Sequence, residues 1–319
     1  MATRLDTLIT HVRSATENQE VSSSVGIPDA EFIRYFNEAQ DHIVAKIIQQ
    51  HKYVFGQEVI IPIVRSQEAY DVPDEAFVKN KLLYVEYSDD GNPDNYFPLR
   101  SKTLLERYSF GSGVPNRYVL RNGQILLSPI PMSLGASLRV NYIKRPCDLD
   151  VRRGSVSAVT LDPSTNTITS LTLTITSDNV SEFNLNEDHI TIIDRLGNIK
   201  MKGVLADSTG ITGAGPTYTF NVDSSFVYQD GESISVGNYI VFGEFASSHH
   251  QLDDQVERFL TTWVMWKIYK RDVAAQNTQD IERELNILEQ DIIESYANIE
   301  DGMVTSPIIY NWEGWEDFN

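Results

Sequence analysis

The spacing of the apolar residues changes twice along this 319-residue chain, and this constrains its fold more than any other feature. At both ends apolar residues recur every three or four positions, which is typical of amphipathic helices. Two helices are predicted at residues 3–18 and 29–51, and two more at 252–272 and 277–302, the last ending at Gly302. Each has one apolar stripe, which has to be buried against another element. We therefore predict that all four helices pack into one bundle.

The first helix is expected to begin with a capping box, in which Thr3 and Asp6 satisfy free backbone groups. The other three helices supply the predicted bundle core. Its members are large apolar side chains at helical spacing: Phe32, Phe36, Ile43, Phe259, Trp263, Trp266, Leu285, Leu288 and Ile292.

Between the helical ends the apolar spacing is two, as in half-buried strands. Asn122-Gly123 joins two alternating runs and is a strong hairpin signal, because a tight hairpin turn needs residues that accept positive φ. The predicted strands are 58–64, 82–88, 117–131 and 137–146, with a short helix at 101–108.

Residues 151–245 differ in composition, since Ser, Thr, Asn and Gly dominate and turn signals separate short strands. A hairpin at 189–205 and a last strand at 239–242 indicate a small β-barrel or sandwich. The expected fold class is α+β: a four-helix bundle formed by the N- and C-terminal helices, with a β-rich middle and this inserted domain. The predicted domain limits are 1–52 with 246–302 for the bundle, 53–150 for the β-rich region, 151–245 for the insertion and 303–319 for an extended C-terminal docking tail.

Residue types that carry catalysis or bind metals form no recognisable pattern in this sequence. Cys147 is the single cysteine, and the HExxH, GxSxG and P-loop motifs do not occur. His249 and His250 are expected to cap a helix or lie on the surface. We predict no catalytic residues, no metal site and no cofactor. No apolar run approaches the length of a membrane span, so no membrane partner is expected.

Acidic residues outnumber basic ones by 45 to 26, for a formal net charge of −19. Proteins that bind nucleic-acid phosphates tightly present lysine and arginine instead. An acidic surface can serve solubility alone, or it can keep passing DNA from adhering, and composition supports both interpretations. From Gln279 to the end of the chain there are eleven acids and one base, Arg283.

The segment Ile27–Ile47 resembles the start of the head–tail connector, or adaptor, proteins of tailed bacteriophages. The matching residues are Asp29, Ile33, Tyr35, Phe36, Asn37, Glu38 and Ala39. Leu5–Arg13, the hairpin 116–131 with Leu138–Pro146 after it, and Leu252–Asp272 resemble further parts of the same family. The likeness covers roughly two-thirds of the chain, while about 152–245 departs from it, since smaller members lack this stretch.

This resemblance implies a structural virion protein in the phage neck, assembled in the host cytoplasm. The expected partners are further copies in a homo-oligomeric ring, commonly of twelve, the portal protein, and tail or tail-hub proteins. DNA would pass through the ring without specific binding. In such a ring, acids of the fourth helix are predicted to line the lumen, and aromatic residues of the tail to dock on the portal. The lumen set is Glu282, Glu284, Glu289, Asp291 and Glu294; the docking set is Tyr310, Trp312, Trp315 and Phe318.

Two other functions remain open from the sequence. A tail-tube or tail-terminator ring would be built from continuous β-sheets, which the four helical segments disfavour. A carbohydrate-binding module on the insertion would need exposed aromatic residues, and that region has few, among them Tyr218, Phe226 and Tyr228.

Overall fold

The computed structural model divides the chain into two compact units. The first comprises Met1–Ile43 and Pro146–Ile292, and the second comprises Val44–Arg145 and Ile293–Asn319. The residues that the structure describes are 3–16, 27–79, 81–103, 111–161, 168–175, 189–204, 217–221, 234–271 and 275–303.

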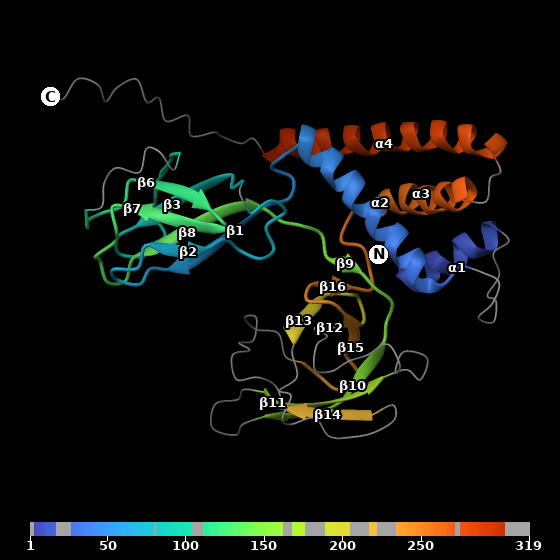
Figure 1. The fold of residues 1–319 in the computed structure, drawn as a ribbon, viewed down its shortest axis with the longest axis horizontal. Helices are drawn as coiled ribbons and strands as arrows, with labels where there is room; N and C mark the ends of the chain where they lie inside the picture. Colours follow the sequence, from blue (N-terminus) through green and yellow to red (C-terminus); the bar gives the residue numbers. More distant parts are fainter. Residues whose placement is uncertain are drawn as a thin grey trace. The chain divides into compact units, whose positions relative to one another are not determined.

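Four described helices agree with the predicted segments to within a few residues (Figure 1). They are α1 (Leu5–Ala15), α2 (Asp29–Gln50), α3 (Val256–Arg271) and α4 (Ala275–Met303). The predicted capping box is wrong, because Arg4 is the N-cap of α1 and makes no side-chain cap bond. Thr3 donates instead to Glu257, through its amide (2.6 Å) and its hydroxyl (2.9 Å). Gly302 lies inside α4 and does not end it.

Helix α2 is attached to a strand segment by two amide side chains near its middle. Asn37 donates to the carbonyl of Leu149 (3.0 Å) and accepts from the amide of the same residue (2.7 Å), as a neighbouring strand would. Gln40, almost fully buried, donates to the carbonyl of Cys147 (2.8 Å). The polar positions of α2 therefore hold the chain where it leaves Pro146 for the strands that follow.

A six-stranded antiparallel sheet of the first unit has the order β13-β12-β15-β10-β11-β14. Its core is aliphatic and includes Leu171, Leu173, Ile192 and Ile240, all fully buried. A short parallel pair, β9 with β16, lies beside it in the sequence. The strands are β9 (Asp148–Leu149), β10 (Gly154–Leu161), β11 (Ile168–Ile175), β12 (Ile190–Ile193), β13 (Ile199–Val204), β14 (Thr217–Asn221), β15 (Tyr239–Phe242) and β16 (Ala246–Ser247).

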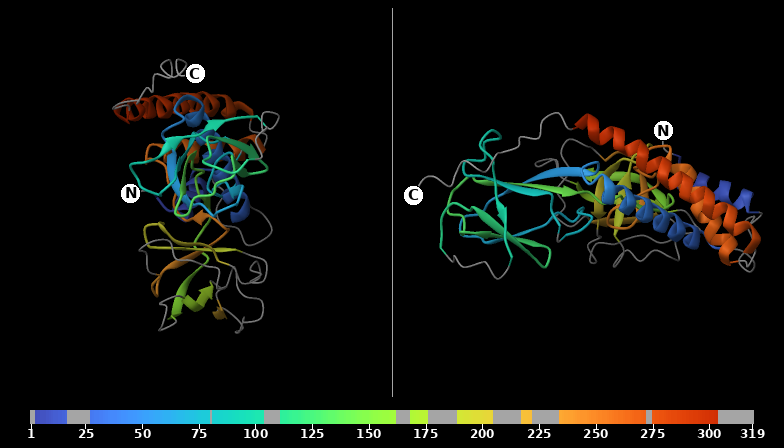
Figure 2. Two further views of the ribbon diagram at one scale, coloured as in Figure 1. Left: turned by 90° about the vertical axis from the view of Figure 1, so that its left-hand side faces the viewer. Right: turned by 90° about the horizontal axis from the view of Figure 1, so that it is seen from above.

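The second unit contains two four-stranded sheets, ordered β1-β8-β3-β4 and β2-β7-β6-β5, which share one core (Figure 2). Tyr87 and Leu138 from one sheet meet Ile125 from the other in that core. The predicted hairpin is confirmed, since Asn122 and Gly123 turn between β6 and β7 with φ of 51° and 74°. The strands are β1 (Gly56–Pro62), β2 (Ala69–Asp71), β3 (Tyr84–Ser88), β4 (Phe97–Pro98), β5 (Arg100–Ser101), β6 (Arg117–Arg121), β7 (Gln124–Ser128) and β8 (Ser137–Ile143).

The predicted four-helix bundle with a small inserted β domain is wrong. Besides the four helices, the described residues form sixteen strands, which are arranged in four sheets. The helices are separated, and only α1 and α3 have closely packed backbones within the described helices. The physical reason is that apolar spacing identifies which face of a helix is buried but not what covers it, and α2 uses part of its surface to hold strand segments.

Two smaller expectations can also be compared with the structure. Ser101, placed at the start of a short helix, belongs to β5, and residues 104–108 of that segment lie outside the described part. No helix within the described ranges is both long and apolar enough to cross a membrane. The predicted domain limits at 52, 150, 245 and 302 stay a prediction.

Candidate functional site

The five acids predicted to line a lumen lie on α4 but do not share one face. Three are bound by neighbouring helices: Glu282 accepts from the indole of Trp266 (3.0 Å), Glu284 pairs with Arg258 (2.7 Å) and Glu289 contacts His42 (2.9 Å). Asp291 and Glu294 are exposed. Positions three or four apart share a helix face, so Asp291 and Glu294 point away from Glu282 and Glu289. Their role in a lumen stays a prediction.

The predicted core residues differ in burial. Phe32, Phe36, Ile43 and Phe259 are fully buried, and Leu285 and Ile292 are buried. Trp263, Trp266 and Leu288 are partly exposed. On α3 the ring of Trp263 lies 4.5 Å from His42 and 5.3 Å from Trp266, centroid to centroid, so α3 and α2 share an aromatic contact.

The four tail residues predicted to dock on the portal, Tyr310, Trp312, Trp315 and Phe318, lie outside the described residues.

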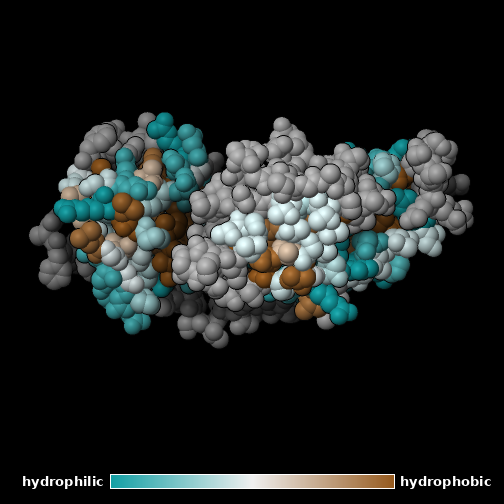
Figure 3. Space-filling model, turned by 90° about the horizontal axis from the view of Figure 1, so that it is seen from below, coloured by the Kyte–Doolittle hydropathy of each residue, from teal (hydrophilic) through white to brown (hydrophobic). Residues whose placement is uncertain are grey.

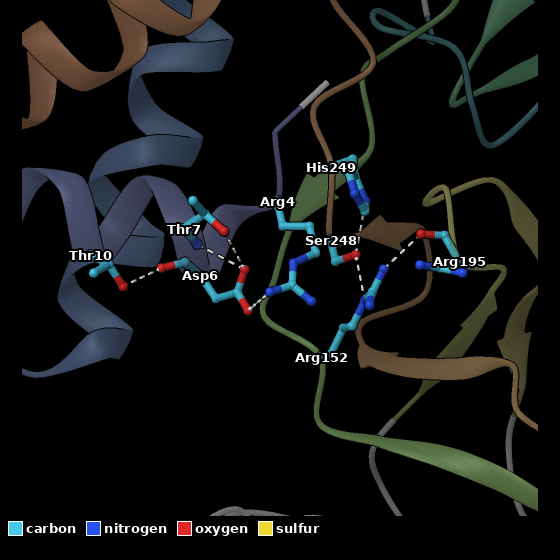
Figure 4. A network of polar contacts seen from close by, with 8 residues as sticks. All are labelled: Arg4, Asp6, Thr7, Thr10, Arg152, Arg195, Ser248 and His249. Carbon is cyan, nitrogen blue, oxygen red and sulfur yellow. Dashed lines mark hydrogen bonds and ion pairs between the residues drawn. The ribbon is translucent and has the colours of Figure 1, made fainter. Parts of the chain in front are cut away.

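A polar network of the first unit lies where the N-terminus of α1 meets the segment after β16 (Figure 4). Arg4 forms an antiparallel bridge with His249, and the amide of Leu5 donates to the carbonyl of Ser248 (2.9 Å). Asp6 pairs with Arg4 at 3.1 Å and accepts from the amide of Thr7 (2.8 Å). We call the residues drawn in Figure 4 the junction network; it ties α1 to the chain that leaves the six-stranded sheet.

Arg152 extends this network to the turn between β12 and β13. Its guanidinium donates to the carbonyl of Arg195 (2.8 Å) and to the hydroxyl of Ser248 (3.4 Å), and it lies 3.8 Å from the ring centroid of Tyr239. No carboxylate pairs with Arg152 in the described part of the chain. Burial lowers the pKa of Arg152, and the nearby charge of Arg4 adds to this.

The imidazole of His249 is held in its neutral form. Burial lowers its pKa, and the charges of Arg152 and Arg4 lower it further. The ring bonds to the hydroxyl of Ser248 through Nδ1 (3.0 Å). The site therefore contains a histidine that resists protonation beside two permanently charged guanidinium groups.

This histidine predicts a pH dependence of stability. Its folded pKa lies below the unfolded value of about 6.5, so as the pH falls the unfolded chain takes up this proton first. Above about pH 7, His249 is neutral in both states and does not reduce the free energy of unfolding. As the pH falls through 6.5 toward the folded pKa, protonation of His249 in the unfolded chain lowers the free energy of unfolding. We expect His249→Gln to show a smaller loss between pH 7.5 and 5.5 than the unmodified chain, measured by urea unfolding. Equal losses would contradict the prediction.

Beside the network lies an open pocket of about 740 Å³. One wall is the β12–β13 turn, and the other is the segment leading into α3. The pocket is lined by Leu196, Gly197, Asn198, His249, His250, Gln251, Leu252, Asp253, Asp254 and Gln255.

His250 is the most buried polar side chain of this pocket, with a relative exposure of 3%. Its Nε2 lies 3.1 Å from Glu257, which can only accept, so Nε2 carries the proton and Nδ1 is left as an acceptor. Nδ1 is buried and has no hydrogen-bond partner. Burial alone would raise the pKa of Glu257, but hydrogen bonds from Thr3 and His250 together lower it. The carboxylate therefore stays charged and holds His250 in place.

The glycine of the turn is required by its surroundings. Gly197 has φ of 86°, and a Cβ there would overlap the ring of His249. We expect Gly197→Ala to lower the free energy of unfolding by about 2 kcal/mol, from backbone strain and overlap together. Gly111→Ala is the matched control, because a Cβ at Gly111 meets open space, and its effect should be near zero. Urea unfolding of both variants tests this; similar effects would contradict it.

Sequence reasoning missed the junction network and misplaced His249 and its neighbour His250. His249 and His250, expected as capping or surface residues, are both buried. Arg4 and Arg152 gave no signal, since a single arginine in a sequence does not reveal its partners. Groups of three or more residues suited to hold a metal are absent from the described residues.

Comparison with known proteins identifies the family to which the chain belongs. The family model described as SU10 adaptor protein matches residues 3–180, which is more than half of the chain. That span includes α1, α2, both sheets of the second unit, and the chain as far as β11. No curated protein matches the sequence. The match confirms the resemblance to phage head–tail adaptors, which are structural proteins of the virion neck. The chain belongs to the SU10 adaptor protein family.

Proposed function

We propose that this chain is the repeating subunit of a ring that joins the portal to the tail of a tailed bacteriophage and continues the DNA channel. The observation that carries the proposal is the family match over residues 3–180. The resemblance noted in the sequence adds a ring, commonly of twelve copies, with the portal on one side and tail or tail-hub proteins on the other. The subunit would assemble in the host cytoplasm, and its role is mechanical and electrostatic.

The charge of the chain supports a passage for DNA. A net charge of −19 gives the ring a strongly negative total, and negative walls do not retain phosphates. We propose that acids of α4 contribute to the lumen. Asp291 and Glu294 are exposed members of the predicted set, and Glu282 is exposed as well.

The aromatic tail supports portal docking. Tryptophan and tyrosine are the side chains that most often anchor protein interfaces, because they bury large apolar areas and carry a polar group. Tyr310, Trp312, Trp315 and Phe318 fall within nine residues of each other. We propose that these side chains attach each subunit to the portal.

The six-stranded sheet is proposed as a peripheral contact module, for a neighbouring subunit, tail fibres or capsid. The way the sheet is attached to the helices supports a rigid module. The junction network and the side-chain hydrogen bonds of Asn37 and Gln40 hold both chain segments that connect the sheet to the helices.

Imaging of the purified chain with purified portal tests the proposal. Negative-stain averages should show a closed ring of this chain coaxial with the portal and with an open centre. The chain alone and the portal alone are the controls. Particles in which the chain adds no rotationally symmetric density to the portal would contradict the proposal.

A further inference from the structure

Charge is distributed very unevenly along this chain. Residues 44–145 contain 13 lysines and arginines against 10 aspartates and glutamates, a net charge of +3. The remaining residues therefore carry a net charge of −22, which together with +3 gives the total of −19. Two copies of such a chain repel each other unless the positive part of one meets the negative part of the other.

The positive segment concentrates arginines on one sheet of the second unit. Arg100 of β5 and Arg117 of β6 are direct partners in the parallel register, so their side chains leave the sheet on the same face. Arg121 lies four residues further along β6, again on that face because strand side chains alternate. Arg117 bonds to the amide oxygen of Asn116 (3.2 Å), and neither Arg117 nor Arg121 has a carboxylate partner within the described residues. We call these three residues the arginine row.

Arg117 and Arg121 carry positive charge without a carboxylate partner within the described residues, so an anionic or hydrogen-bond-accepting partner would complement them. Among the residues coloured on the face drawn in Figure 3, hydrophobic side chains occur in small groups between hydrophilic ones.

The pocket beside the junction network has the complementary chemistry. Asp253 and Asp254 lie exposed on its α3 side. The unpartnered Nδ1 of His250 is a buried acceptor in its lining, and a buried acceptor without a donor costs free energy. His249, on the same lining, is neutral because its pKa is lowered. A guanidinium supplies several donors and a positive charge in one planar group, so it suits the two exposed carboxylates of this pocket.

We propose that the arginine row of one copy docks at the pocket formed by Asp253, Asp254 and His250 of a second copy. This inference rests on the proposed ring, and it identifies the surfaces that join neighbouring subunits. A contact between two different surfaces of the same chain is heterologous, and such contacts close into rings when the rotation between copies allows it. Double-stranded DNA is a weaker occupant of the arginine row, because the −19 charge of the chain repels it at longer range.

Reciprocal charge changes test the contact. The first variant is Arg117→Glu with Arg121→Glu, and the second is Asp253→Arg with Asp254→Arg. Each variant alone should reduce ring assembly in the presence of portal by about tenfold or more at low salt, measured by sedimentation velocity. An equimolar mixture of the two should regain assembly, since each then offers the surface that the other has lost. Restoration by mixing is specific to contacts between copies, because a contact within one chain cannot be repaired by a second chain.

Three controls make the result decisive. Lys81→Glu changes an exposed base of the same segment outside the arginine row and should assemble normally. Asp253→Asn with Asp254→Asn removes charge while keeping side chains that can cap α3, so it should weaken assembly even if the arginine substitutions disturb folding. Thermal unfolding of every variant reports on folding.

The outcomes separate this contact from the proposed function. If the unmodified chain forms rings and the arginine variants form them equally well, or if mixing restores nothing, the contact is wrong and the ring remains. If the unmodified chain forms no ring even on the portal, the proposed function fails, and the contact fails with it. If the arginine variant keeps its rings but loses binding to a fluorescent DNA duplex, the arginine row binds nucleic acid and the contact is overturned.

Discussion

A chain that ends at Pro307 is expected to lose binding to the portal, with a dissociation constant at least about a hundredfold higher than that of the full chain. The shortened chain lacks Tyr310, Trp312, Trp315 and Phe318. Each buried aromatic anchor of an interface typically contributes about 2 kcal/mol or more, so the loss of several is large. Surface plasmon resonance with immobilised portal measures the change.

The same truncation also removes the acids Glu313, Glu316 and Asp317, so a matched control is needed. A full-length chain with these three acids changed to their amides keeps the aromatic residues and should bind nearly normally. Far-UV circular dichroism of the truncated chain should equal that of the full chain, since the removed residues follow the last described helix. Intact portal binding by the truncated chain would refute tail docking.

Asp150→Ala is expected to destabilise the folded chain by about 3 kcal/mol or more, because it removes a buried carboxylate that binds the half-buried guanidinium of Arg153 and a strand amide. Asp150 is buried and accepts from Arg153 through Nε and Nη2, the shorter bond being 2.8 Å. It also accepts from the amide of Phe242 in β15 (2.8 Å). One carboxylate thus joins the segment that precedes β10 to the neighbouring strand β15.

Two further variants distinguish this ion pair from a general loss of an acid. Asp150→Asn retains an acceptor for the amide of Phe242 and should cost less than Asp150→Ala. Asp280→Ala removes an exposed carboxylate from α4 and should change the free energy of unfolding by no more than about 0.5 kcal/mol. Urea unfolding provides the comparison. Equal effects of Asp150→Ala and Asp280→Ala would show that the buried ion pair does not stabilise the sheet.

Local elements followed closely from the residue pattern. The steps between Phe32, Phe36 and Ile43 predicted α2, and all three side chains are fully buried. Asn122-Gly123 predicted the turn between β6 and β7, and both residues have positive φ. These features are set by interactions between residues close in sequence, where spacing and turn preferences apply directly. The resemblance to phage adaptors also came from the sequence, and the family match bears it out.

The arrangement of those elements did not follow. The bundle was expected because four apolar stripes need cover, yet the described helices are separated and sixteen strands form four sheets. The parallel pair of β9 and β16 joins two-residue segments nearly a hundred positions apart, too short for any spacing pattern to reveal. Contacts of this kind depend on the free energy of the whole folded chain and not on the residues of any short segment.

The candidate site shows the same division. His249 and His250 were expected to cap a helix or lie on the surface, but both are buried. Arg4 and Gly197, which come from distant segments, contact His249 in the folded chain. Similarly, the charge difference between residues 44–145 and the rest can be read from the sequence. The pairing of Arg100 with Arg117, and the isolation of the His250 acceptor inside a pocket, arise only when the backbone is folded. Composition and local spacing are properties of neighbouring residues, whereas burial and partnership are properties of chain segments that meet in space.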